Sequence, residues 1–186
     1  MHFRLLIIAM LAFAAISCTR RATYSASEQS GLDPSENREE KNAAGTENIL
    51  IGPTTRVAFE NAPYNTWFHP AYLRYQPNQK IMDELQPLLE NVTVKGYIGS
   101  WCLDSQRDLP RLFKVIDQAR FPHSRLQLIS LREDKSSLKG EEKGDSITAV
   151  PTFILYRDGK EVGRIVETAY PTLEMNMLTI LKGDTK

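Results

Sequence analysis

From residue 78 onward, the hydrophobic positions follow two alternating patterns, one typical of amphipathic helices and one typical of buried strands. Apolar residues spaced three and four apart predict helices over 78–90, 103–120 and 171–181. Short apolar runs predict strands over 92–98, 126–131, 152–156 and 161–166. Asp158-Gly159 lies between the last two runs and indicates a hairpin turn.

Three further features bear on this order of elements. Pro87 lies inside the first helical pattern and predicts a kink or an early end, whereas Pro171 takes a tolerated first-turn position. The charged, glycine-containing stretch 132–146 predicts a loop with a short helix around 136–141. A strand-helix-strand unit followed by a hairpin predicts a mixed α/β sheet, with helices packed on both faces.

The segment 49–77 lacks a clean period and is rich in aromatic residues among prolines and asparagines. The favoured interpretation is an N-terminal extension whose aromatic side chains cover one face of the domain. The alternative is an aromatic surface that binds a partner or a substrate peptide. These aromatic residues are Phe59, Tyr64, Trp67, Phe68, Tyr72 and Tyr75.

The first residues predict export. Arg4 precedes an unbroken apolar run over 5–16, which at 12 residues is too short to cross a hydrocarbon core of ~30 Å as a helix. Ala15-Ile16-Ser17-Cys18 resembles the lipobox of a bacterial lipoprotein signal, which implies cleavage before Cys18 and a lipid on its sulfur. An ordinary secretory signal, or a membrane-tethering helix, is the alternative. The polar stretch that follows, to about 48, predicts a flexible tether.

Composition narrows the possible chemistry. The 186 residues carry 23 basic and 23 acidic side chains, so no general attraction to nucleic acid or to anionic lipid is expected. Three histidines and two cysteines are spread widely, so we expect no metal site. With Cys18 lipidated, Cys102 is the only free thiol, in a compartment where disulfides persist.

Cys102 follows Trp101 in the motif Trp-Cys-Leu-Asp-Ser, and Val150-Pro151-Thr152 comes near the start of the third strand. Pro110 lies eight residues after the cysteine. Together with the order of elements over 92–181, these motifs resemble the thioredoxin family, in a branch with the Trp-Cys-x-Asp-Ser form. The resemblance implies a thioredoxin-like fold in which Pro151 is cis and faces the thiol.

Two positions depart from the thioredoxin pattern. Ser105 stands where the resolving cysteine would be, and Gly96 stands where thioredoxins place a buried acidic residue. Both departures point away from an efficient two-cysteine reductase. The chain keeps a candidate nucleophile but lacks the thiol that would resolve its mixed disulfides.

Each residue of the candidate site has an expected role. Cys102 at a helix N-terminus would be favoured as the thiolate, because unpaired N–H groups and the helix dipole attract an anion. Ser105 could donate a hydrogen bond to that sulfur, while Asp104 serves the helix end rather than catalysis. The resemblance implies that Pro151 completes the catalytic site and that Trp101, Val150 and Thr152 contact the substrate. Burial of Cys102 as an inert core thiol is the alternative.

We therefore expect four regions: a signal peptide at 1–17, a tether at 18–48, an aromatic-rich extension at 49–77 and a thioredoxin-like domain at 78–186. The expected function is monothiol thiol-disulfide exchange through Cys102 in the bacterial cell envelope, without a cofactor. Its partners would be protein or small-thiol disulfides, an external reductant, and the membrane through the lipid. A redox-inactive peptide-binding module is the first alternative, and an iron-sulfur cluster held with glutathione is the last.

Overall fold

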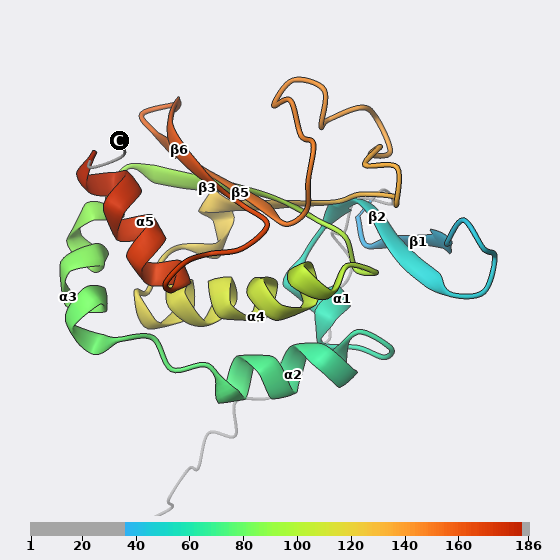
Figure 1. Cartoon of the computed structure of the whole chain (residues 1–186), viewed down its shortest axis with the longest axis horizontal. Helices are drawn as coiled ribbons and strands as arrows, with labels where there is room; N and C mark the ends of the chain where they lie inside the picture. Colours follow the sequence, from blue (N-terminus) through green and yellow to red (C-terminus); the bar gives the residue numbers. More distant parts are fainter. Residues whose placement is uncertain (1–35, 184–186) are drawn as a thin grey trace, which may run out of the picture. The chain divides into compact units, whose positions relative to one another are not determined.

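Six strands form one mixed sheet in the part of the chain that the structure, a computed structural model, describes, which is residues 36–183 (Figure 1). Their order is β1-β2-β4-β3-β5-β6, with β3 and β4 parallel and every other neighbouring pair antiparallel. The strands are β1 Arg38–Lys41, β2 Asn48–Thr54, β3 Val92–Ile98, β4 Leu126–Ser130, β5 Thr152–Arg157 and β6 Lys160–Val166.

The helical patterns of the sequence are confirmed to within two residues. The helices of the described residues are α1 Arg56–Phe59, α2 Asn65–Arg74, α3 Gln79–Leu88, α4 Leu103–Gln118 and α5 Leu173–Lys182, with a 3₁₀ turn at His123–Arg125. Helix α3 ends one residue after Pro87. Two details of the prediction were wrong: 136–141 is not helical, and Pro171 precedes the N-cap Thr172 instead of standing in the first turn.

Local chemistry explains where several elements begin and turn. The Asn78 side chain accepts hydrogen bonds from the backbone of Lys80 and Ile81, which caps α3. Asp158 and Gly159 have φ values of 49° and 77°, the left-handed conformations that a two-residue hairpin of type I′ requires.

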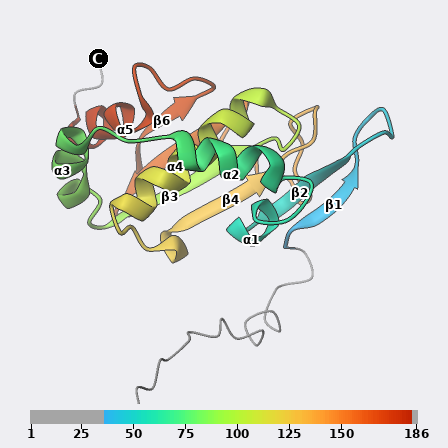
Figure 2. The ribbon, with the colours of Figure 1, turned by 90° about the horizontal axis from the view of Figure 1, so that it is seen from below.

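All the described helices except the 3₁₀ turn contribute to one hydrophobic core on one face of the sheet, which differs from the expected helices on both faces. Figure 1 shows α2, α3, α4 and α5 below the sheet, and Figure 2 shows them in front of the strands when seen from below. Within β3, Val92, Val94 and Ile98 belong to this core. The one-sided arrangement follows from β2, which runs antiparallel to β4 instead of starting a parallel crossover.

The opposite face of the sheet carries a smaller cluster, made of Tyr97, Ile129, Leu131, Val150 and Ile154. The segment 131–151 passes over this face as an irregular loop (Figure 1). Helices therefore cover one face of the sheet. The loop covers the other face at the end near Cys102.

The aromatic extension covers the helical face, as the favoured interpretation predicted. Phe59, Tyr64 and Phe68 are buried, and the Phe68 ring meets the Phe113 ring of α4 edge to face, with centroids 5.5 Å apart. Their burial leaves these three residues no part in a partner surface. The extension is an integral part of the core, since β2 of the same segment pairs with β4.

The expected tether is ordered over its last residues. Strand β1 lies within 18–48 and pairs with β2, and the Arg132 side chain forms an ion pair with Glu40 of β1. For this part the prediction of flexibility was wrong, because the sequence pattern does not reveal a polar edge strand that pairs with β2. The predicted signal peptide, Cys18 and the start of the predicted tether lie outside the described residues. Among the described helices, none has the length and apolar character needed to cross a membrane.

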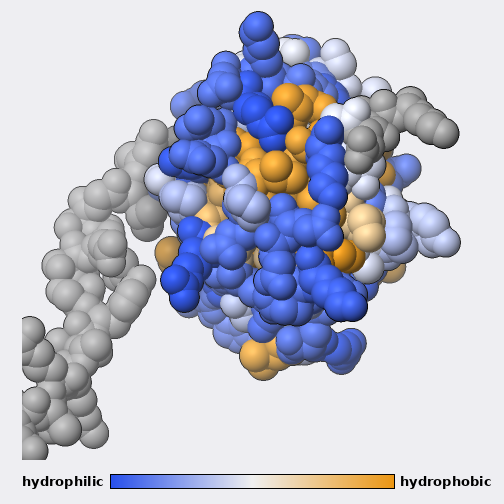
Figure 3. All heavy atoms as spheres, turned by 90° about the vertical axis from the view of Figure 1, so that its left-hand side faces the viewer, coloured by the Kyte–Doolittle hydropathy of each residue, from blue (hydrophilic) through white to orange (hydrophobic). Residues whose placement is uncertain are grey.

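The side of the molecule where α3 and α5 lie is mostly hydrophilic. Figure 3 shows a narrow group of hydrophobic residues between polar side chains on this side. Leu85 of α3 and Leu181 of α5 are buried within the core below. The larger exposed apolar side chains include Leu103, Leu73 and Tyr170.

Candidate active site

Cys102 stands at the junction of β3 and α4, where it is the N-cap residue of the helix. Its backbone is extended, with φ −88° and ψ 125°, and its N–H donates to the Gly99 carbonyl at 2.9 Å. Its carbonyl accepts the N–H of Gln106 at 2.9 Å, which begins the helix. No side chain caps the helix. The first-turn N–H groups therefore remain available to an anion beside the cysteine.

The sulfur of Cys102 is partly exposed and faces the loop that carries Pro151. Its Sγ donates to the Val150 carbonyl at 3.4 Å, and the Val150-Pro151 peptide bond is cis. Cys102 is thus half-buried and packs against the second cluster, without being fully enclosed in the core. The structure brings Cys102 and Pro151 together, although 48 residues separate Cys102 from Val150.

The backbone around Pro151 is only partly used. The Pro151 carbonyl accepts the N–H of Glu167 at 2.7 Å, which joins the end of β6 to the site. Within residues 36–183, the N–H of Val150 donates no hydrogen bond. This leaves one donor beside the thiol for an extended segment.

Ser105 is placed differently from the expectation. It is 1% exposed, and its Oγ accepts the backbone N–H of Gly99 at 3.1 Å. Among the described residues it forms no hydrogen bond with the Cys102 sulfur. The hydroxyl satisfies the buried backbone at the end of β3, which is a structural role.

Trp101 and Thr152 are held by hydrogen bonds to backbone carbonyls. The Trp101 indole N–H donates to the Leu131 carbonyl at 2.9 Å, and Lys135 lies over its ring at 5.3 Å. Thr152 is buried, and its hydroxyl donates to the Ala149 carbonyl at 2.8 Å. Val150 is also buried, so Trp101 is the one of the three predicted substrate contacts that is partly exposed.

Gly96 has no room for the acidic residue of thioredoxins. A Cβ at this position would lie 2.7 Å from Leu128 Cδ2 and 3.1 Å from Phe153 Cδ1. Contacts that short do not occur without displacing the core. The glycine is therefore a packing requirement of β3, and the structure offers no buried carboxylate at this position.

A charged network on the first two turns of α4 was missed by the sequence reasoning. Arg107 donates to Asp104 at 2.5 Å and to the buried Asp108 at 2.7 Å, and it reaches the Glu167 carbonyl and the Thr168 hydroxyl. The hydrogen bond to Asp108 raises the pKa of Arg107 above its usual range, although burial opposes the shift. The spacing of Asp104 and Arg107, three residues apart, was the available signal. Asp104 thus lies in the first turn of α4 and pairs with Arg107.

The loop over the second cluster is fastened by Asp145. Its carboxylate accepts from Lys95 Nζ at 2.7 Å, from Tyr97 at 2.6 Å and from Tyr156 at 3.1 Å. Burial acts to raise the pKa of Asp145, but the hydrogen bonds from Lys95 and Tyr97 outweigh it and lower the pKa. Burial and the hydrogen bond to Asp145 raise the pKa of Tyr156 to about 12.

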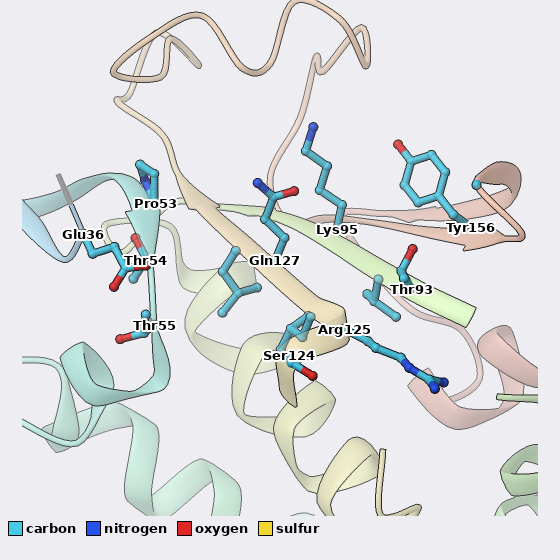
Figure 4. A pocket seen from close by; sticks show the side chains of 14 residues that line it. Glu36, Pro53, Thr54, Thr55, Thr93, Lys95, Ser124, Arg125, Gln127 and Tyr156 are labelled. Carbon is cyan, nitrogen blue, oxygen red and sulfur yellow. The ribbon is translucent and has the colours of Figure 1, made fainter. Parts of the chain in front are cut away.

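A large hollow lies on the sheet, and Cys102 is not among the residues that line it. It has a volume of about 760 Å³ and occupies the part of the sheet face that the loop leaves open. Figure 4 shows Thr93, Lys95, Gln127 and Tyr156 projecting from the strands into it. A second hollow, of about 440 Å³, adjoins the site and is lined by Trp101, Ser100 and Gln106 on one side and by Trp67 of α2 on the other. No group of three or more metal-ligating side chains occurs within the described part.

Comparison with known proteins gives a distant relationship and a fold. No family model matches the chain. Thioredoxin H-type 1 of Nicotiana tabacum is 29% identical over 89 residues, which are 48% of this chain and 66% of the relative, just under two thirds of its length. The crystal structure of a protein of unknown function, PA1234 from Pseudomonas aeruginosa, has a TM-score of 0.52 at 13% identity, covering 67% of this chain and 87% of that one.

Fasciola hepatica thioredoxin is also similar, at 20% identity and a TM-score of 0.36, over 53% of this chain and 86% of that protein. The chain has a thioredoxin-like fold, and about half of it is similar in sequence to a thioredoxin. The predicted fold class is confirmed, with helices gathered on one face of the sheet.

Proposed function

We propose that this protein carries out monothiol thiol-disulfide exchange through Cys102. One observation supports this most: a partly exposed thiol stands at the N-terminus of a 16-residue helix, with its sulfur 3.4 Å from the carbonyl that precedes a cis proline. A helix of this length presents its unpaired N–H groups and positive dipole end to the sulfur. The thiolate is the species that attacks a disulfide.

The proposed reaction needs no cofactor. The Cys102 thiol gives its proton to solvent, and the thiolate attacks one sulfur of a client disulfide. A bond forms between Cys102 and that sulfur, the client's sulfur-sulfur bond breaks, and the second client sulfur leaves as a thiolate that takes up a proton. Because Ser105 is not a thiol, an external thiol must then attack the mixed disulfide and restore Cys102.

The groups around the sulfur have roles in this proposal. The free N–H of Val150 would pair with an extended client segment, as backbone groups at an open edge do. Trp101 would cover one side of the sulfur, and Pro151 would hold the loop beside it. Leu103, whose side chain is 79% exposed directly after the cysteine, adds an apolar contact.

The location of the reaction is part of the proposal. The lipobox-like Ala15-Ile16-Ser17-Cys18 supports a lipid anchor at Cys18 and a domain that faces the periplasm or the exterior. In that compartment disulfides persist, so substrates for exchange are present. The clients would be proteins or small thiols joined by disulfides.

The test is the rate at which Cys102 reacts with iodoacetamide across pH 5–9. We expect alkylation at pH 7 to exceed that of a free cysteine by about threefold, because a larger thiolate fraction is partly offset by a less nucleophilic sulfur. The Cys102→Ser variant is the control, because it keeps Cys18 and places a favourable N-cap residue on α4. A Cys102 that reacts no faster than free cysteine would contradict the proposal.

A redox-inactive binding module is the second candidate. It is favoured by the buried Ser105, which cannot resolve a mixed disulfide, and by Gly96, which excludes a buried acid. This candidate predicts that Cys102→Ser retains partner binding in full. Trapping mixed disulfides on Cys102 in cells distinguishes the two, since a binding module yields none that depend on this thiol.

A further inference from the structure

A groove lined by arginines runs from the candidate site along the junction of α2 and α4. The hollow beside Trp101 and a third hollow of about 340 Å³ share two lining residues, Trp67 and Gln106. Gln106 begins the helical hydrogen bonding of α4 by donating to the Cys102 carbonyl. The two hollows thus share these walls, and the first is also lined by Trp101, the residue directly before Cys102.

The far end of the groove is cationic. Its lining includes Arg74 of α2 and both Arg107 and Arg111 of α4, with Tyr75 and Trp67 as aromatic walls. Arg107 and Arg111 pair with Asp108, which is 1% exposed, and Arg107 also pairs with Asp104. Within residues 36–183, the Arg74 side chain forms no ion pair and no hydrogen bond. Asp104 and Asp108 thus pair with Arg107 and Arg111, and the buried Glu174 lies at the same end against Tyr75, so Arg74 is the arginine of this lining whose charge has no partner in the described part of the chain.

Arg111 keeps free donors for a ligand, whereas Arg107 already donates to Asp104, Asp108, Glu167 and Thr168. The side chains of Arg107 and Arg111 are each 34% exposed. A guanidinium has five N–H donors, and Arg111 uses one of them on Asp108 while it lies 5.2 Å from the Tyr75 ring. Carboxylates are the protein groups whose geometry and charge match such donors.

We propose that this groove binds an acidic segment of the client polypeptide whose disulfide Cys102 attacks. The inference rests on the proposed function and adds a class of substrate to it. Along α4, Arg107 and Arg111 stand about 7 Å and about 13 Å from Cys102 at 1.5 Å per residue. An extended chain covers ~3.3 Å per residue, so acidic residues two to four positions from the client cysteine would reach them.

The experiment offers the protein a choice of peptides in one reaction. Equal amounts of two symmetrical disulfides, made from the pentapeptides Cys-Gly-Gly-Glu-Glu and Cys-Gly-Gly-Lys-Lys, are mixed with the reduced protein at ~20 mM salt. The reaction is stopped early with acid, and the two adducts on Cys102 are measured by mass spectrometry. We expect the acidic adduct to exceed the basic one by about fivefold or more, and the ratio to fall towards one at ~0.5 M salt.

Variants locate the effect. Arg74→Glu should bring the ratio to about one or below, and Arg74→Gln to an intermediate value. Arg74 has no partner within the described residues, so neither change removes an observed contact. Lys160→Glu is the matched control: it changes the net charge equally, but it lies at the end of the β5–β6 hairpin remote from Pro151, and it should leave the ratio unchanged.

The outcomes separate the two proposals. Adducts that form readily in equal amounts, or a preference that survives Arg74→Glu, would overturn the acidic groove and leave the exchange reaction standing. A preference of the same size for the disulfide of 3-mercaptopropionate over cystamine would also overturn the acidic groove. Both of these probes are too short to reach Arg111. The absence of any adduct with every disulfide would overturn the exchange reaction, and the groove's substrate with it.

Discussion

The hydroxyl of Ser105 could stabilise the fold or change the reactivity of the Cys102 sulfur. In the structure its Oγ accepts the N–H of Gly99 at 3.1 Å, and both groups are buried. A serine that served the sulfur would instead change the reactivity of Cys102. The observed hydrogen bond therefore indicates that Ser105 stabilises the fold.

Ser105→Ala should lower the stability of the protein and leave the thiol unchanged. Removal of the acceptor leaves the Gly99 N–H buried without a partner, which costs about 1–3 kcal/mol in the free energy of unfolding. Urea unfolding measures that loss, and iodoacetamide alkylation at pH 7 measures the thiol. A variant of unchanged stability whose Cys102 alkylates several times more slowly would show that the hydroxyl acts on the sulfur.

The candidate site could be predicted in part at this scale. Two short motifs of the sequence contain Cys102, Trp101 and Pro151. The structure brings Cys102 and Pro151 together. The partner of Ser105 could not be predicted, because the choice between Gly99 N–H and Cys102 sulfur depends on a rotamer set by packing. The same holds for Arg107, which contacts Glu167 and Thr168 some sixty residues along the chain.

At the level of elements, the loop 131–151 substitutes for a helix on its face of the sheet. It covers Tyr97 and Ile129, and one carboxylate, Asp145, fastens it to β3 and β5 through Lys95, Tyr97 and Tyr156. Arg164 of β6 adds a hydrogen bond to the Asp145 carbonyl at 2.8 Å. Because the loop ends at Val150 and Pro151, its attachment also positions the backbone beside Cys102.

Asp145→Asn should loosen this loop while the rest of the fold is retained. The amide keeps the shape of the side chain but loses the charge that pairs with Lys95, a loss of about 1–3 kcal/mol for a partly buried charged hydrogen bond. We expect faster tryptic cleavage within the loop, at Lys139 or Lys143. Cleavage at Lys160, in the β5–β6 hairpin, serves as the internal control and should not change.

The pH dependence of the same contact has a defined sign. Because the pKa of Asp145 is lowered in the folded protein, its contribution is complete above the usual value of about 3.9 and is lost as pH falls through the folded value. An acid-stable protease should therefore cleave the native loop faster below about pH 4. The increase should be smaller in Asp145→Asn, where the lowered pKa values of Glu141 and Glu142 in the same loop leave a remaining pH dependence. A native loop that is cleaved equally at pH 3 and pH 6 would contradict the assignment.

Elements with a strong local pattern were predictable from the sequence, and their arrangement was not. Strand β3 and helix α4 follow directly from periodic apolar positions, because burial on one side of an element repeats at its own period. Strand β1 is short and polar, and only its pairing with β2 makes it a strand. The gathering of helices on one face depends on the direction of β2, a long-range property that no local pattern encodes.

Across the whole described part of the chain, residues 49–77 and the helices after them share one core. Phe59 and Phe68 are fully buried, and they stack on each other with centroids 5.6 Å apart. Arg56 donates to Asp117 of α4 at 2.6 Å and lies over the Phe113 ring. On the far side, Glu174 of α5 accepts from Tyr75 at 2.5 Å and from the backbone of Asn78 at 3.0 Å. The extension is thus joined to both α4 and α5.

A chain that starts at residue 78 should therefore not fold on its own. A chain that starts at residue 78 loses β2 from its place beside β4 and uncovers Phe113 and the neighbouring apolar face of α4. Loss of even one buried phenylalanine costs about 3–5 kcal/mol, and small domains have only about 5–15 kcal/mol of stability. We expect the shortened chain to be unfolded by circular dichroism, whereas a chain that starts at residue 36 should unfold cooperatively with the melting temperature of the longer protein. Cooperative unfolding of the chain that starts at residue 78 would show instead that the aromatic segment is an accessory layer, because the core formed by α3, α4 and α5 on the sheet would then suffice without it.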